Sequence, residues 1–124
     1  MKQLINWIKE KKLIDFSWLK KAVFVELKEI DVSEDPVRPE LDLNWRRSFN
    51  RQIYGLKYDG KVEGIICLAF TKDVPHTVRE LDLMSRVAMY EKNADIIIAY
   101  TVWSRKKGAG KKIMQETLQF GKEN

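Results

Sequence analysis

The stretch IIIAYTVWSRKKGAGKK, residues 96–112, joins an apolar run to a short basic segment that contains two glycines. Its opening isoleucines are consecutive and do not alternate with polar residues, which predicts a buried strand covered on both faces. From about Gly108 the sequence predicts a final helix that runs to Phe120 and ends at Gly121. The residues of this helix expected to face inward are Ile113, Met114, Thr117 and Leu118.

A helix start that follows glycines and cations is suited to binding phosphate. The first backbone N–H groups of a helix have no partner within the helix, and the helix dipole adds positive charge there. Gly108 and Gly110 let an anion approach the backbone closely. Residues 105–112 contain five cations and no acid. We therefore predict a phosphate or diphosphate site across roughly residues 105–111, with a solvated basic turn as the alternative.

The glycine spacing distinguishes between known nucleotide motifs. A P-loop would need glycine in place of Arg105 and serine or threonine in place of Lys112, and a dinucleotide fingerprint would need glycine in place of Ile113. The pattern Arg105-x-x-Gly108-x-Gly110 instead resembles R/Q-x-x-G-x-G/A, the acetyl-coenzyme A loop of the GNAT N-acetyltransferases. The stretches ELDLNWR and IYGLKYDGKVEGI also resemble small acetyltransferase-like proteins of tailed phages.

This resemblance implies how acetyl-coenzyme A (acetyl-CoA) would be bound. Backbone N–H groups of the loop would hold the diphosphate, and the main chain of the preceding strand would pair with the pantetheine arm. Which of Ala99, Tyr100 and Val102 meets the thioester carbonyl is left open. The implied cofactor-binding residues are Ala99, Tyr100, Thr101, Val102, Arg105, Lys106, Lys107, Gly108, Ala109, Gly110 and Lys111.

The activity implied by the resemblance is transfer of acetyl from the thioester to an amine, of a small molecule or a protein. The amine must lose a proton, so a base or a water chain is needed. Glu63, Glu80, Asp73 and His76 are candidate bases, and Tyr100 is a candidate acid toward the thiolate. Each has a structural alternative: Glu80 fits a helix cap, Glu63 fits a solvent-facing hairpin position, and Tyr100 fits packing.

The remaining sequence predicts an α+β protein. Asp59-Gly60 between two apolar runs predicts a hairpin with a type I′ turn, and Thr77 with Glu80 predicts a capping box. The expected elements are helices at 3–12 and 16–21, strands at 23–30, 51–58 and 61–70, a short helix near 43–49, a helix from 77 that ends at Asn93, and the strand and helix described above.

The resemblance refines this prediction to one domain, residues 1–124, with a mixed, mostly antiparallel sheet and helices packed on both faces. A GNAT domain continues with another strand and helix, so the domain is expected to be short at its C-terminus. A fragment, a trimmed relative and a cleft completed by a partner chain are all left open.

Composition limits the classes of partner. The chain has 124 residues, a net charge of +5, one cysteine and one histidine. Cys67 is expected to be a small core residue, which together with the absence of a disulfide framework favours a cytoplasmic setting. No apolar run is long enough to span a membrane. The alternative function is a non-catalytic GNAT-like module for nucleic acid or another anionic partner, for which Trp45-Arg46-Arg47 is a candidate contact. A homodimer is also left open.

Overall fold

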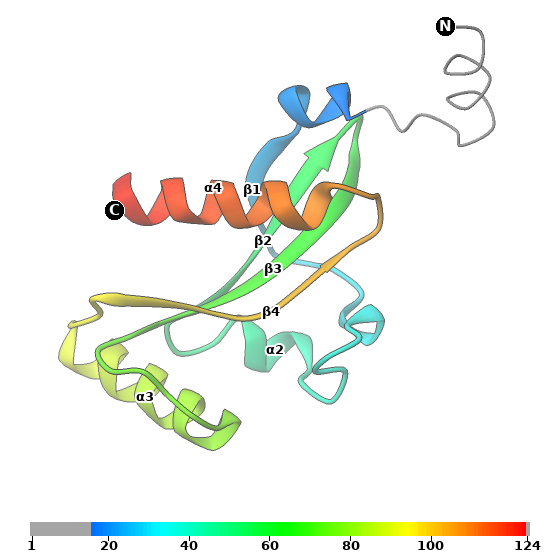
Figure 1. The fold of residues 1–124 in the computed structure, drawn as a ribbon. Coiled ribbons are helices and arrows are strands. Elements are labelled where there is room, and N and C mark those ends of the chain that lie inside the picture. The colour runs from blue at the N-terminus through cyan, green and yellow to red at the C-terminus, as the bar shows by residue number, and fades with distance from the viewer. Residues whose placement is uncertain (1–15, 124) are drawn as a thin grey trace, which may run out of the picture.

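The computed structural model describes residues 16–123, so the helix expected at residues 3–12 lies outside the described residues. Four strands form one sheet in the order β1-β2-β3-β4, and each of these three pairings is antiparallel (Figure 1). The strands are β1 (Val23–Leu27), β2 (Arg51–Tyr58), β3 (Lys61–Thr71) and β4 (Ile96–Ser104). The helices are η1 (Ser17–Lys21), η2 (Val32–Glu34), α2 (Leu43–Arg46), α3 (Val78–Glu91) and α4 (Ala109–Glu123). The predicted α+β class is confirmed.

The β2–β3 hairpin turns at the predicted pair. Asp59 and Gly60 have φ angles of 52° and 76°, which is the left-handed backbone that a type I′ turn requires at both central positions. The turn joins the two central strands of the sheet, so its geometry helps to set the register of β2 against β3.

Helices cover both faces of the sheet, as predicted. Side chains alternate along β3, so that Ile66 and Leu68 pack under α4 and η1, whereas Ile65 and Cys67 face the opposite side. Figure 1 shows α4 on one side of the sheet and α2 and α3 on the other. All four of these β3 side chains are fully buried.

The capping box at the start of α3 is confirmed, whereas two other helix ends differ from the prediction. Thr77 caps α3: its hydroxyl accepts the N–H of Glu80 at 3.0 Å, and the Glu80 carboxylate accepts the N–H of His76 at 3.0 Å. This confirms the capping box. The helix ends at Glu91, and its C-cap is Lys92, whose φ is 54°, where Asn93 was expected to end the helix. The first short helix is a 3₁₀ helix whose N-cap is Phe16, with Ser17 already inside it.

Other expectations were wrong. In α4, Ile113 and Thr117 are buried as expected, but Met114 and Leu118 are 39% and 66% exposed. Gly121 lies within α4 because the helix continues to Glu123. The strand predicted at 23–30 ends at Leu27.

β4 is the last strand in the sheet order, so its isoleucines are half-buried and not fully covered. Consecutive apolar residues in this strand do not mark a central position. Among residues 16–123, no helix is both long and apolar enough to cross a bilayer.

Candidate functional site

β4 is an edge strand, and its ladder with β3 contains an irregularity. It pairs with β3 along one edge, and no described strand pairs with its other edge. In the register with β3, Cys67 lies opposite Thr101 and Leu68 opposite Ala99, so Tyr100 is an extra residue. This is a β-bulge, which leaves one residue out of the ladder and redirects its side chain. The bulge and the open edge both fall in the segment predicted to bind the pantetheine arm.

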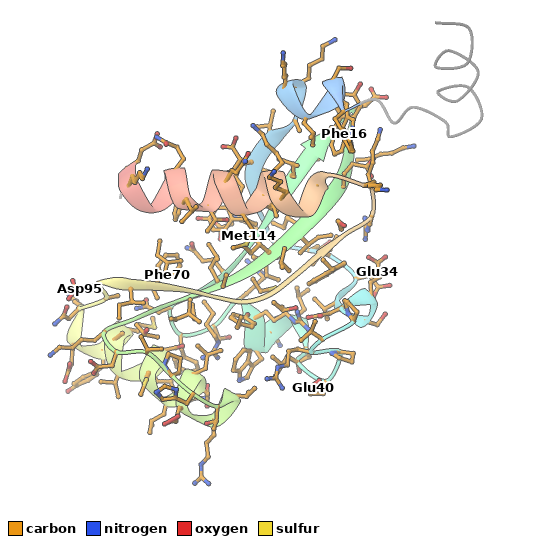
Figure 2. All side chains as sticks on the ribbon, in the orientation of Figure 1. Phe16, Glu34, Glu40, Phe70, Asp95 and Met114 are labelled. Carbon is orange, nitrogen blue, oxygen red and sulfur yellow. The ribbon has the colours of Figure 1, made fainter. Side chains whose placement is uncertain are left out.

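The loop after β4 is anchored to its neighbours at its first two residues. The N–H groups of Arg105 and Lys106 both donate to the carbonyl of Glu63, at 2.7 and 3.3 Å. The Arg105 guanidinium donates to both carboxylate oxygens of Glu34 at 2.9 Å, and Figure 2 labels Glu34 on the neighbouring η2 segment. Neither the side chain nor the N–H of Arg105 is therefore free for a ligand in this arrangement.

Four N–H groups further along the loop remain open. Within the described residues, no backbone hydrogen bond is formed by the N–H of Lys107, Gly108, Gly110 or Lys111, whereas the N–H of Ala109 donates to the carbonyl of Lys106 at 3.1 Å. Gly108 has a φ of 94°, a conformation that glycine adopts without strain. The predicted phosphate site therefore narrows from residues 105–111 to residues 107–111.

A groove of about 350 Å³ runs beside this helix start, lined by Phe16, Leu19, Gly108, Lys111, Lys112 and Gln115. Gly108 and Gly110, the two glycines at this helix start, differ in their surroundings. A Cβ on Gly108 would lie 2.8 Å from the Phe16 ring, so Gly108 is required for close packing. A Cβ on Gly110 would meet no atom within 4 Å, so the backbone there is open. Phe16 lines the groove beside the helix start, and Figure 2 labels this residue at the same end of the molecule.

A lysine of the loop is held against aromatic rings. The ammonium of Lys106 lies 4.7 Å from the centre of the Trp18 ring and 5.2 Å from that of Tyr58. These cation–π contacts connect η1, the β2–β3 hairpin and the loop. They position positive charge beside the open N–H groups.

The structure separates the candidate catalytic residues. The Glu80 carboxylate is engaged in the cap of α3, the alternative given above for that residue. Glu63 contributes its carbonyl to the loop anchor, and its side chain is half-buried. Asp73 and His76 lie between β3 and α3, on a segment that does not reach the 105–111 loop.

Tyr100 lies on the face opposite α4, where its ring packs edge-on against Trp45 at 5.6 Å between ring centres. Its hydroxyl is the one buried side-chain polar atom of the described residues without a hydrogen-bond partner. Burial, and next the nearby Cys67, raise the pKa of Tyr100 well above its usual value. The hydroxyl is protonated at neutral pH, but its raised pKa makes it a weaker acid than an ordinary tyrosine. Cys67 is a fully buried core residue, as expected.

A buried ion pair on this face was not foreseen from the sequence. Arg46 and Asp35, both with 0% side-chain exposure, pair at 2.7 Å between Nη1 and Oδ2. Arg46 also donates to the carbonyls of Leu41 and Arg38. Because Arg46 is inaccessible, its proposed role as a nucleic-acid contact is wrong. The run Trp45-Arg46-Arg47 suggested an exposed basic cluster, and only the folded loop shows that its middle residue points inward.

Asp35 joins this pair to β4. Its second oxygen, Oδ1, accepts the N–H groups of Val37 and Arg38 at 2.8 and 3.1 Å, and the hydroxyl of Thr101 at 2.9 Å. Burial alone would raise the pKa of Asp35, but the bonds from Arg46, the two N–H groups and Thr101 hold that pKa below 3.8. The carboxylate therefore stays charged and fixes residues 35–41 against the edge strand.

Comparison with known proteins adds no relative: no family model, curated protein or solved structure matches the chain. Within residues 16–123, no group of three or more histidine, cysteine or acidic side chains is placed to hold a metal ion. The features that bear on function are therefore the geometry of β4, the loop and α4.

Proposed function

We propose that this protein is an N-acetyltransferase that binds acetyl-CoA through the 105–111 loop and transfers the acetyl group to an amine. The single observation that carries the proposal is the run of unpaired N–H groups at Lys107, Gly108, Gly110 and Lys111, at the start of a helix and beside a groove. Such N–H groups, with the helix dipole and nearby lysines, favour a diphosphate. The resemblance of the loop to GNAT proteins names the ligand.

The open edge of β4 supports the rest of the assignment. An extended ligand arm bearing amide groups can pair with an unpaired strand edge as an added strand does. The bulge at Tyr100 lies in the ladder with β3, on the paired edge of β4, and it redirects the backbone locally, so a backbone N–H near it can turn toward a ligand. That N–H would stabilise the negative charge that develops on the carbonyl oxygen as the amine attacks.

The reaction needs few side chains. The amine nitrogen bonds to the thioester carbonyl carbon, the carbon–sulfur bond breaks, and the thiolate leaves and takes a proton. Tyr100 lies at the bulge, so we assign it as the candidate proton donor, although its raised pKa weakens it as an acid toward the thiolate. Glu80 is poorly suited to act as the base, because its carboxylate is engaged in the cap of α3.

Isothermal titration calorimetry with acetyl-CoA tests the proposal, using two variants of one glycine. At Gly110 there is open space, so Gly110→Ala and Gly110→Glu should both fold. We expect Gly110→Ala to bind like the wild type, because a methyl group meets no neighbour. Gly110→Glu should lose binding, because its carboxylate would lie where the diphosphate binds. Failure of the wild-type chain to bind acetyl-CoA would contradict the proposal.

A second candidate function is a non-catalytic module for nucleic acid, favoured by a cluster of lysines. Contacts between Gly108, Lys106, η1 and the hairpin bring these segments to one end of the molecule. The lysines on them that make no ion pair with a described residue are Lys20, Lys21, Lys57, Lys61, Lys106, Lys107 and Lys111. Retardation of single-stranded DNA that weakens steeply with salt would favour this module. Absence of retardation at low salt would exclude it.

A further inference from the structure

A second cavity lies on the other side of β4 from the diphosphate groove. It has a volume of about 140 Å³ and is lined by Arg38, Pro75, His76, Thr77, Val78, Leu81, Ile98 and Tyr100. At about 30 Å³ per water molecule, this is space for roughly five waters or one small organic molecule. Ile98 and Tyr100 come from β4 on either side of the strand position where the bulge begins, so the cavity adjoins the segment that the acetyl group would reach.

Arg38 is held at this cavity by the buried ion pair. Its N–H donates to Asp35, and its carbonyl accepts from Arg46, so its backbone is fixed at both ends. Its side chain is 43% exposed, and its one ion pair among described residues is a 3.8 Å contact with the exposed Glu40. Such a pair is weak in water. The guanidinium is thus anchored through its backbone while its charge remains available.

The surroundings of the cavity favour a negative charge. None of the lining side chains is acidic, and Arg38 and His76 are the basic ones. The cavity also touches the first residues of α3, a helix of 14 residues whose dipole is positive at this end. Glu80, the acid in the first turn, is already engaged by the N–H of His76. A carboxylate entering the cavity would therefore meet a cation and a helix start, with the hydroxyl-bearing ring of Tyr100 as a wall.

We propose that this cavity binds the carboxylate of a small acceptor, so that the amine acetylated is that of a small amino acid or a similar amino-carboxylate. The guanidinium of Arg38 is the recognition group, because it can bind a carboxylate through two parallel hydrogen bonds. The identification of the ligand as the acetyl acceptor rests on the proposed acetyltransferase function. The carboxylate site itself does not depend on that function.

Nuclear magnetic resonance of His76 gives a direct readout, because it is the one histidine of the chain and it lines the cavity. The probes are glycine, acetate and glycinamide, titrated separately at constant pH and ionic strength. Glycine and acetate should shift the His76 ring signals in a saturable way, whereas glycinamide, which lacks the carboxylate, should not. An equal response to glycinamide would overturn the proposal.

Two arginine variants identify the recognition group. Arg38→Ala should weaken glycine binding by on the order of tenfold or more, which is the scale of a charge-assisted hydrogen bond. Arg79→Ala is the matched control, because Arg79 is an exposed arginine in the first turn of α3 that does not line the cavity. It should bind glycine like the wild type. Equal loss in both variants, or in neither, would overturn the assignment to Arg38.

Calorimetry with acetyl-CoA separates this proposal from the proposed function. Arg38→Ala should bind acetyl-CoA with wild-type affinity, because Arg38 does not line the groove beside the 105–111 loop. Glycine binding without acetyl-CoA binding would contradict the acetyltransferase and leave the carboxylate site standing. Acetyl-CoA binding without a glycine response would contradict the carboxylate site alone.

Discussion

The two faces of the sheet are stabilised by different chemistry. Under α4 the buried contacts are mainly apolar, with Ile66, Leu68 and Ile113 fully buried. The opposite face has an apolar cluster that includes Ile65 and Cys67, and it also holds the fully buried ion pair of Arg46 and Asp35. Apolar packing usually stabilises a core at least as well as a buried ion pair, because removing both charges from water can cost more free energy than their attraction returns. The difference indicates that the second face holds a particular loop in a particular place.

That loop carries Arg38 and is bonded to Thr101 of the edge strand. The apolar face places the helix start that we assign to the diphosphate, and the polar face places the cavity that we assign to the acceptor. Variants on the two faces should therefore differ in what they disturb, even where they cost similar stability.

The largest expected effect is that of Arg46→Ala. Removing the guanidinium leaves Asp35 buried without its partner, which should lower the free energy of unfolding by about 3–5 kcal/mol. Urea denaturation followed by circular dichroism measures this loss. Arg47→Ala is the matched control, because the neighbouring arginine is exposed and its loss should change stability by less than about 0.5 kcal/mol. Similar losses in the two variants would contradict the buried pair.

A somewhat smaller loss is expected on the apolar face. Ile113→Ala removes a fully buried side chain from α4 and should cost about 2–4 kcal/mol. Leu118→Ala, on the same helix but at a 66% exposed position, should cost less than about 0.5 kcal/mol.

Glycine binding distinguishes the two faces more clearly than stability does. At temperatures where both variants are folded, Ile113→Ala should keep glycine binding at the Arg38 cavity, and Arg46→Ala should weaken it. The reverse order would show that the ion pair does not position Arg38.

The smallest expected effect concerns acid stability. The pKa of Asp35 in the folded protein is held below its ordinary value of 3.8. Its contribution to stability is therefore fully present above that ordinary value and is lost as the pH falls through the lowered folded value. The difference in unfolding free energy between the wild type and Asp35→Asn should stay constant from neutral pH down to about pH 4 and shrink below it. A constant difference at all pH values would contradict the assignment.

Features set by residues close together in the chain could be predicted from the sequence more completely than the buried polar contacts. Asp59-Gly60, the capping box at Thr77 and the basic turn before α4 are local signals, because each depends on residues close together in the chain. Met114 and Leu118 were misplaced because apolar spacing alone does not show where a helix faces an open sheet edge.

The polar face depends on residues far apart. Asp35 and Thr101 are separated by 66 positions, and their hydrogen bond exists only once β4 lies beside the 31–50 loop. No local pattern identifies Arg46 as buried, since arginine is one of the residues least often found inside. The cavity at Arg38 could not be predicted either, because its lining residues also come from distant parts of the chain.

We propose that the N–H groups at residues 107–111 bind a diphosphate beside the open edge of β4. Nitrogen–proton correlation spectra recorded with increasing coenzyme A test it residue by residue. We expect the largest shifts at Lys107, Gly108, Gly110 and Lys111, with further shifts along Ile98–Val102. Shifts confined to other parts of the chain, or no saturable shifts, would contradict the account.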